Sequence, residues 1–553
     1  MWTGRAIGHE INIRFQLTLQ LAVMTTIISV IIALPLGIVS AVKQNTWIDY
    51  LVRTVAVAGV AIPSFWLGIM IILGLLIFTA VLLRAGLTRA LVDDLFGNEP
   101  PRPVQLRVWD WWSPASNEEY GQYFEAIEKA FEAQNPDVDI VYQIVPFGNY
   151  VQKLSTAMVG STPPDVFQSS VYWAEGFYQR GMLRPLDDLL AANATAPGPQ
   201  RVTEEMFLPS AWRHNQARDG RVFGVPQIID AQCLLWNLDI LKRAAAHDEE
   251  VRALFPRRED GTIDYDRLRF DAVEDWDHFR RLTHKLTRRG ADGQITQAGF
   301  VINAYGGGAG MFSPWLAANG GRYQDGDGSR ALFAGASGVE ALRFMARLYW
   351  EDKVCPPFRR QISDSELFQE GKVACMVAGT WSGKDITRNT LGWNRFAKTA
   401  FPPGPRGSGQ KTVTWGNMLV VTRRCQNVDA AWRYIQFVCG LEGNVLRAEI
   451  LGYNGPRRDF YDTEQWHRAK RERPYLSNVK QICLAGDKLR HTEIIAVNHQ
   501  VNPVIETLLL RFPDIEAGKG PHASLEAALA EAERNANGVF RRYNEQVARW
   551  EDR

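Results

Sequence analysis

Hydrophobic residues are concentrated in two long runs near the start of the chain. Residues 15–42 and residues 54–83 contain no charged side chain, over 28 and 30 positions respectively. A helix needs about 20 apolar residues to cross a bilayer, so each run is long enough to span one. Neither run ends in a clear small-residue cleavage site, which favours two transmembrane helices over a signal peptide.

A stretch of different composition follows the second run. Residues 91–103, LVDDLFGNEPPRP, combine acidic residues, a glycine and three prolines. Such a composition is typical of an exposed, semi-rigid linker. We therefore expect a boundary here, with a membrane-associated part before the linker and a soluble body after it.

The soluble body begins with alternating strand and helix patterns. The stretches VQLRVW, VDIVYQIV and DVFQSS are strand-like, and helical patterns separate them. Ser116 and Glu119 have capping-box spacing at the start of the first helical pattern, and Pro136 ends it. Its apolar face comprises Tyr120, Tyr123, Phe124, Ile127 and Phe131. The order strand, helix, strand, helix, strand predicts an α/β fold with a parallel sheet.

Aromatic residues cluster where the first and third strands should end. Trp109, Trp111 and Trp112 follow the first strand, and Tyr172 and Trp173 follow the third. Ligands of parallel sheets bind outside the carboxyl ends of the strands, where both clusters should meet. Flat aromatic faces can stack on the C–H faces of sugar rings. We assign Trp109 to the core, because it continues the buried strand, and expect the other four rings to contact a sugar.

Charge and motif spacing exclude several classes of function. The chain carries 62 basic and 61 acidic residues, for a net charge of +1, so no nucleic-acid partner is indicated. The nine histidines show no paired metal-ligand spacing, and no serine or cysteine lies in a nucleophile motif. We therefore expect no metal, no cofactor and no catalytic residue.

The six cysteines form no CxxC pair, which argues against zinc or thioredoxin-like chemistry. Their even number permits disulfides in an exported protein, whereas burial as free thiols is the other interpretation. Spacing cannot choose between them. The cysteines are Cys233, Cys355, Cys375, Cys425, Cys439 and Cys483.

Two glycine-rich stretches are partly similar to ligand-binding motifs. GPRGSGQKT, residues 404–412, is similar to a phosphate-binding P-loop, but Gln410 separates the last glycine from Lys411. A strand-like stretch also follows it, where a helix is required. DGDGS, residues 325–329, has the start of a calcium loop without the closing glutamate. We interpret the first as no nucleotide site and the second as a turn.

The first part of the chain resembles a dipeptide/nickel-type ABC importer permease. The resemblance covers residues 8–83 and is carried by ALPLGIVSAVKQNTWID and AIPSFWLGI. Such permeases have six helices and a coupling loop, so residues 1–90 are expected to be a partial permease that acts mainly as an anchor. Lys43 and Arg53 favour a cytoplasmic loop between the two helices, as the resemblance also implies. The chain after residue 84 would then lie outside the cytoplasmic membrane.

From residue 104 onward the chain is similar to family 1 of the ABC-importer extracellular solute-binding proteins, the sugar-binding kind. The motifs are VQLRVWDWWSP, VPFGNYVQKLSTAMVGSTPPDVFQSS, GRVFGVPQIIDAQCLLWNLDILKRA, LFQEGKVACMVAGTWSG and TVTWGNMLVV. The resemblance implies a two-lobed periplasmic-binding-protein fold with a hinge, in which the chain crosses near residues 224, 372 and 419. Lobe I would comprise 104–224 with 372–418, and lobe II 225–371 with 419–553.

The same resemblance adds site residues. It implies that Asp230 in IIDAQCLLWN reaches the ligand, whereas Asn237 supports the local strand. Tryptophans in SPWLAANGG and AGTWSG, Trp315 and Trp381, are candidates for stacking. In TWGNM, the candidates at the third crossing are Trp415 and Asn417.

These observations favour a membrane-anchored solute-binding component of an ABC importer. It would capture a sugar outside the cytoplasmic membrane and deliver it to permease subunits that a separate ATPase powers. A carbohydrate-active enzyme is an alternative, since glycosidases also combine aromatic rings with carboxylates, but two carboxylates must flank the bond. Dipeptide transport by the partial permease is another. A further alternative is that the fusion is an artefact of two adjacent genes.

Overall fold

A computed structural model describes most of the chain from Val104 to Glu551 and part of the stretch before residue 74. Before residue 104, the described positions are 24, 30–31, 33–35, 37–44, 46–47, 49–52, 54 and 73. After it, the positions left out are 161, 172, 195–197, 199–200, 303–306, 327–328, 358–363, 390–392, 489–493, 520–521, 523 and 552–553. The chain divides into two compact units, residues 1–101 and 102–553, which are taken separately below.

In the first unit, the described residues form helix on both sides of a turn. Residues 37–42 and 49–52 are helical, and residues 43–44 form the turn. Thr46 Oγ1 donates to the Lys43 carbonyl at 2.6 Å, and the Ser40 hydroxyl donates to the buried carboxylate of Asp49. Within the part of the chain that the structure describes, no helix is both long and apolar enough to cross a membrane. Most of both uncharged runs lies outside the described residues.

The second unit is built on one mixed sheet. Its strand order is β2-β1-β3-β9-β4-β7-β6-β5, with β10 paired to β9 and β8 paired to β4. The strands are β1 Val104–Asp110, β2 Val138–Ile144, β3 Val166–Ser170, β4 Val225–Asn237, β5 Arg288–Arg289, β6 Ile295–Val301, β7 Val373–Gly379, β8 Phe396–Thr399, β9 Thr412–Val421 and β10 Gly486–Lys488.

The parallel α/β start is confirmed. β1 lies between β2 and β3 and runs parallel to both, and the helices α5 (Glu118–Gln134) and α6 (Phe147–Val159) connect them. The expected apolar face of α5 is buried, and the helix ends two residues before Pro136. The capping prediction was wrong by one residue, because Asn117 is the N-cap and accepts the Glu119 N–H at 3.1 Å. The Ser116 hydroxyl instead donates to the Ser113 carbonyl.

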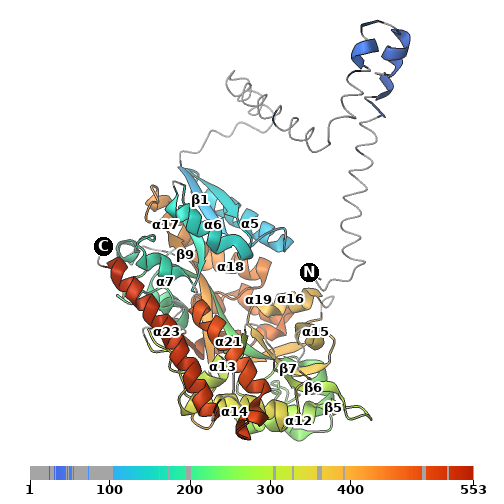
Figure 1. Ribbon diagram of the computed structural model, residues 1–553, viewed down its shortest axis with the longest axis vertical. Coiled ribbons are helices and arrows are strands. Elements are labelled where there is room, and N and C mark those ends of the chain that lie inside the picture. Colours follow the sequence, from blue (N-terminus) through green and yellow to red (C-terminus); the bar gives the residue numbers. More distant parts are fainter. Residues whose placement is uncertain are drawn as a thin grey trace. The chain divides into compact units, whose positions relative to one another are not determined.

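Helices cover both faces of the sheet (Figure 1). The remaining helices of the unit are α7 Ala174–Gln179, α8 Asp187–Asn193, α9 Pro209–Arg213, α10 Leu238–Ala245, α11 Glu249–Arg252, α12 Trp276–Leu286, α13 Gly307–Ala318, α14 Ala336–Trp350, α15 Asp364–Gln369, α16 Ser382–Asn389, α17 Val428–Cys439, α18 Leu441–Leu451, α19 Glu464–Glu472, α20 Val479–Leu484, α21 Ile494–Leu510, α22 Phe512–Glu516 and α23 Leu525–Glu551.

Buried apolar residues form four clusters, two along each half of the sheet. The α5-side core contains Leu106, Phe131, Ile435 and Leu451, and the α6-side core contains Leu154, Phe167 and Phe177. The α12-side core contains Phe279, Leu342 and Ile505, and the α19-side core contains Leu235, Phe396 and Trp466. The first two cores pack on β2, β1 and β3, and the other two on β4, β7 and β6, an arrangement that suits a two-lobed binding-protein fold.

Strand pairing groups some segments differently from the lobes expected above. β7 pairs with β4 and β6, so residues 373–379 lie with the half of the sheet that contains 232–237. α17 and α18 contribute to the α5-side core together with β1 and β2. The chain thus returns to the first half of the sheet at β9, and the lobe boundaries themselves stay a prediction.

Smaller expectations about motifs were also met. Residues 404–412 lead directly into β9, which is a strand and not the helix that a P-loop needs. In the DGDGS stretch, Asp325 accepts the N–H groups of Ser329 and Arg330 at 2.7 and 3.1 Å, as a turn-forming aspartate does. All six cysteines are buried free thiols, so the disulfide alternative has no support.

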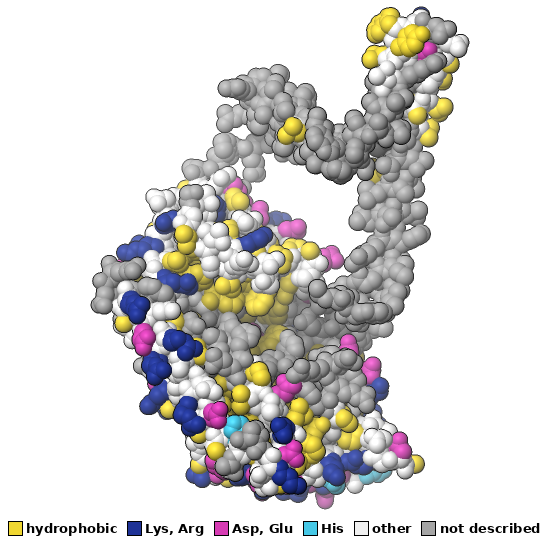
Figure 2. Space-filling view, in the orientation of Figure 1, with side chains coloured by type: hydrophobic (Ala, Val, Ile, Leu, Met, Phe, Trp, Pro, Cys, Tyr) yellow, Lys and Arg dark blue, Asp and Glu magenta, His cyan; other side chains and the backbone are white. Residues whose placement is uncertain are grey.

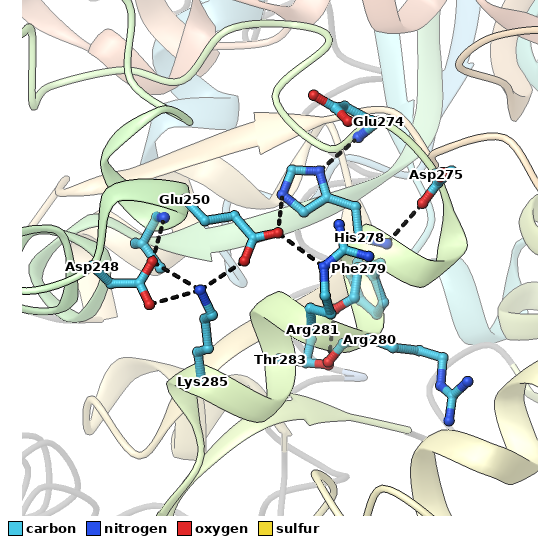
Figure 3. Close-up of polar contacts among 11 residues, drawn as sticks. Asp248, Glu250, Glu274, Asp275, His278, Phe279, Arg280, Arg281, Thr283 and Lys285 are labelled. Carbon is cyan, nitrogen blue, oxygen red and sulfur yellow. Dashed lines mark hydrogen bonds and ion pairs between the residues drawn. The ribbon is translucent and has the colours of Figure 1, made fainter.

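The charged cluster that joins α11 to α12 is structural (Figure 3). Glu250 accepts from Arg281 at 3.0 Å and from Lys285 at 2.7 Å, and Lys285 also reaches Asp248 at 2.7 Å. His278 Nδ1 accepts the Glu274 N–H at 3.2 Å, and burial lowers the pKa of this histidine. Asp248, Glu250, Arg281 and Lys285 therefore each have a partner of opposite charge within this cluster.

Candidate ligand-binding site

A polar gap interrupts the buried face of the sheet between two hydrophobic cores. On one face of β4, Ile228 belongs to the α5-side core and Leu234 to the α12-side core. Side chains alternate between faces along a strand, so Asp230 and Gln232 occupy the positions between them on that same face. On the opposite face of β4, an unbroken apolar series belongs to the α19-side core. Buried polar groups of this kind need partners, and a gap between two cores is a suitable place for a polar ligand.

β9 supplies the matching half of this gap. Asp230 is directly opposite Trp415, and Asn417 is opposite Ile228 on one side and Ser170 on the other. Residues directly opposite one another in an antiparallel pair project from the same face of the sheet. Trp415 and Asn417 are both partly exposed, whereas the next strand positions on this face enter the α5-side core. The structure therefore brings Trp415, Asn417 and Asp230, all of which the sequence named as site candidates, to the same face of the sheet.

The turn after β7 is hydrogen-bonded to the strand that carries Asp230. Thr380 Oγ1 donates to Asp230 Oδ1 at 3.0 Å and accepts the Ala231 N–H at 3.1 Å. The buried Lys398 ammonium donates to the Thr380 carbonyl at 2.6 Å. Burial raises the pKa of Asp230 to about 6, although the Thr380 hydroxyl and the Lys398 charge oppose the shift. Burial lowers the pKa of Lys398.

We call these hydrogen bonds of Thr380 and Lys398 the clamp. The clamp fixes the backbone directly before Trp381. Its ring lies so close to Gly379 that a Cβ built on this glycine would stand 1.6 Å from a ring carbon, which only glycine tolerates. The Trp381 ring also contacts Trp415, with ring centroids 5.2 Å apart and planes tilted by 52°. Trp381 is partly exposed and directly follows Thr380, the residue that is hydrogen-bonded to Asp230.

A second group of rings lies at the carboxyl ends of β1, β2 and β3. Trp111 contacts Trp173 at a centroid distance of 5.7 Å, Tyr150 at 5.0 Å and Phe147 at 5.9 Å, all edge-on. Trp111, Trp173 and Trp415 all pack against the α6-side core while remaining partly exposed. Hydrophobic side chains gather on the surface around α5 and α6 (Figure 2). The α6-side core therefore contacts rings from both aromatic groups.

Asp110 sets the direction of the loop that carries Trp111. Its Oδ1 accepts the Trp112 N–H at 2.8 Å, which turns the chain directly after β1. The carboxyl group is buried, and this burial raises its pKa to about 7, against the effect of the two backbone N–H groups. Because successive side chains leave the strand on opposite faces, Trp111 reaches the ring group and Trp112 turns away from it.

Three tryptophans of the sequence prediction lie in cores. Trp109 was assigned to the core, and it packs in the α6-side core. Trp112 is 4% exposed in the α5-side core, stacked on Tyr120. Trp315 has no exposed surface and lies in the α12-side core. The rings of Trp112 and Trp315 offer no open face here, so we leave both out of the proposed site, and Tyr172 lies outside the described residues.

Two features of the site were missed in the sequence. Phe147 is 59% exposed and lies just after β2, so the argument that found the rings after β1 and β3 would also have found it. The clamp of Thr380 and Lys398 had no comparable signal. Its members come from separate strands, and only the pairing of β4 with β7 and β8 brings them together.

A mixed sheet with a polar, ring-lined gap suits a protein that binds a small solute. The sequence family described as bacterial extracellular solute-binding protein matches residues 114–444, more than half of the chain. The chain belongs to this family. A second family, described as binding-protein-dependent transport system inner membrane component, matches residues 33–112.

Curated relatives match each part separately. A protein of Brucella abortus (strain 2308) named as a binding protein is 23% identical over 321 residues, covering 58% of this chain and 68% of that protein. The dipeptide transport system permease protein DppB of Alkalihalophilus pseudofirmus is 43% identical over 68 residues, or 12% of this chain and 20% of the permease. The chain therefore spans only about a fifth of that permease.

Solved structures share the fold of the second unit. The sugar-binding protein MalE of Xanthomonas citri matches with a TM-score of 0.62 at 19% identity, covering 80% of this chain and 99% of that chain. A cyclic alpha-maltosyl-1,6-maltose binding protein of Arthrobacter globiformis matches with a TM-score of 0.61 at 18% identity, covering 79% and 99%. At these identities the similarity establishes the periplasmic-binding-protein-like fold.

Proposed function

We propose that this chain captures a sugar or oligosaccharide outside the cytoplasmic membrane, as the membrane-anchored solute-binding component of an ABC importer. The observation that carries the proposal is the polar gap between the α5-side and α12-side cores. Asp230 and Asn417 supply hydrogen-bonding groups there, and Trp381 and Trp415 supply flat rings beside them. Rings beside acceptors suit a ligand with C–H faces and hydroxyl groups, which describes a carbohydrate.

The second group of rings favours an extended ligand. Trp111 and Trp173 add ring surface beyond the gap and pack against the α6-side core, as Trp415 does. Phe147 contacts both of these rings. Two separate groups of rings suit a ligand with more than one sugar ring. An oligosaccharide is therefore the preferred ligand class, and the sugar-binding proteins of the same fold lend this preference support.

A binding assay tests the sugar proposal and the enzyme alternative together. The full chain in detergent is titrated calorimetrically with maltose, maltotriose, acarbose, tagatose and a panel of other oligosaccharides. We expect saturable binding of at least one member and recovery of that sugar uncleaved after prolonged incubation. Absence of binding across the panel would contradict the sugar proposal, and cleavage would favour a carbohydrate-active enzyme.

Membrane attachment is proposed from the first 90 residues. The two uncharged runs of 28 and 30 residues and the match to an inner-membrane family support an anchor, with the binding unit on the periplasmic or extracellular side. Separate permease subunits and a separate ATPase would complete the importer, because the chain covers only a small part of a permease.

We expect the full chain to sediment with membranes, whereas a fragment starting at Val104 stays in the supernatant. The reason is that removing both apolar runs removes the segments able to enter a bilayer. Ultracentrifugation followed by immunoblotting against the binding unit measures how much of each protein is in the membrane pellet and how much is in the supernatant. A single 62.4 kDa band in native membranes would also show that the fusion is made as one piece. Full-length protein in the supernatant without detergent, or a shorter native product, would contradict the anchor.

A further inference from the structure

A cavity far from the ring groups has a cationic lining. It has a volume of about 450 Å³ and lies between α19 and the loop of residues 258–267. Its lining includes five basic side chains, Arg258, Arg267, His467, Lys470 and Arg471, and three carboxylates, Asp264, Asp266 and Glu464. A volume of this size is within the range of small-molecule sites.

The three carboxylates of the cavity are already engaged. Asp264 accepts from Arg267 at 2.7 Å and from Arg258 at 3.2 Å, and Asp266 accepts from Arg258 at 3.2 Å. Glu464 pairs with Arg471 at 2.5 Å. The acidic groups therefore hold the arginines in place and leave no carboxylate for a further cation.

Lys470 is a cationic side chain of the lining that pairs with none of these carboxylates. Its ammonium has no hydrogen-bond or ion-pair partner among the residues that the structure describes, and it is partly buried. Burial lowers its pKa, and the neighbouring charges that add to the shift are the cations Arg267 and Lys480. The contrast is the cluster of Figure 3, where Lys285 is held by two carboxylates at 2.7 Å.

We infer that this cavity is a binding site for an oxyanion of the phosphate or sulfate class, either free or carried on a small molecule. Lys470 would supply the point charge, and the N–H groups of Arg267 and Arg471 that face away from their carboxylates would supply directional donors. Ser477 also lines the cavity, but its hydroxyl is already donated to the Pro474 carbonyl at 2.7 Å. The inference does not depend on the sugar proposal, because no residue of the two sites is shared.

Calorimetry and thermal unfolding of the full chain in detergent test the site, with sodium phosphate titrated against sodium chloride at matched ionic strength. We expect saturable phosphate binding and a rise in melting temperature that chloride does not produce. Lys470→Gln should weaken phosphate binding at least about tenfold, since a charge-assisted hydrogen bond is lost. Lys372→Gln is the matched control, because Lys372 is exposed and paired with Glu370, and its phosphate affinity should equal that of the wild type.

A second measurement separates binding from folding. Because the charges that act most on Lys470 are the cations Arg267 and Lys480, Lys470→Gln in phosphate-free buffer should melt no lower than the wild type. Glucose 1-phosphate provides the arm for a carried phosphate, and tighter binding than inorganic phosphate would assign the rest of the cavity to the organic part. The inference is overturned if neither anion binds saturably, if Lys470→Gln binds phosphate as well as the wild type, or if the variant melts lower without phosphate.

Discussion

Replacing Trp315 with alanine is expected to lower the free energy of unfolding by about 3–5 kcal/mol while leaving sugar affinity unchanged. The ring is fully buried in the α12-side core. Its neighbours include Phe344 at a centroid distance of 4.9 Å and Phe401 at 4.8 Å, and rings on further sides complete the packing. Truncation would leave a cavity that these aromatic neighbours cannot fill. Denaturant unfolding gives the stability, and calorimetric titration gives the affinity.

Trp381→Ala is the comparison variant, for which we expect the opposite pattern of effects on affinity and stability. Both tryptophans were stacking candidates in the sequence, but Trp381 is only partly buried, against Gly379 and Trp415. We expect its removal to weaken sugar binding and to change stability much less than Trp315→Ala does. If Trp315→Ala lowered affinity without lowering stability, the separation between core and site described above would be wrong.

The contribution of Asp110 to the stability of the binding unit should fall as the pH rises from about 4 to about 7. Its pKa is raised by burial from 3.8 to about 7, so the folded state holds a proton that the unfolded state has already lost across this window. One such group contributes at most about 1.4 kcal/mol per pH unit. Above the folded pKa the contribution no longer changes.

Asp110→Asn isolates this contribution. Asparagine keeps a carbonyl oxygen for the Trp112 N–H but does not titrate, so the variant should lose slope and should be the more stable protein at pH 8. Denaturant unfolding of both proteins at intervals between pH 4 and pH 8 measures the difference. Asp230 titrates in the same direction with a pKa of about 6, so the variant retains some slope. Identical slopes in the two proteins would contradict the buried, proton-holding state of Asp110.

The parts of the fold that depend on local pattern could be predicted from the sequence. The strand-like stretches predicted β1, β2 and β3, and the spacing of Tyr123, Ile127 and Phe131 predicted the buried face of α5. The N-cap of α5 was misplaced because Ser116 and Asn117 can both cap a helix, and only the backbone angles of Asn117 decide between them. Rings at the carboxyl ends of strands followed from the parallel order.

The parts of the site that depend on tertiary contacts could not be predicted. A single tryptophan in a short motif has the same sequence appearance in a core and at a surface, as Trp315 and Trp381 illustrate. The clamp at Thr380 requires β4 to lie beside β7 and β8, which follow it by more than a hundred residues along the chain. Asp230 could be named from its motif, whereas its hydrogen bond to Thr380 could not.

The most direct test of the sugar site is calorimetric titration of the best-bound oligosaccharide into three single-ring variants and the wild type. Trp111→Ala and Trp381→Ala each remove one exposed ring from the two groups and should weaken binding about 5- to 150-fold, the loss of about 1–3 kcal/mol for one stacked ring by analogy with base stacking. Trp350→Ala removes a partly exposed ring on α14, away from both groups, and should leave affinity unchanged. Wild-type affinity in both Trp111→Ala and Trp381→Ala would contradict the assignment of the sugar to the polar gap and the neighbouring group of rings.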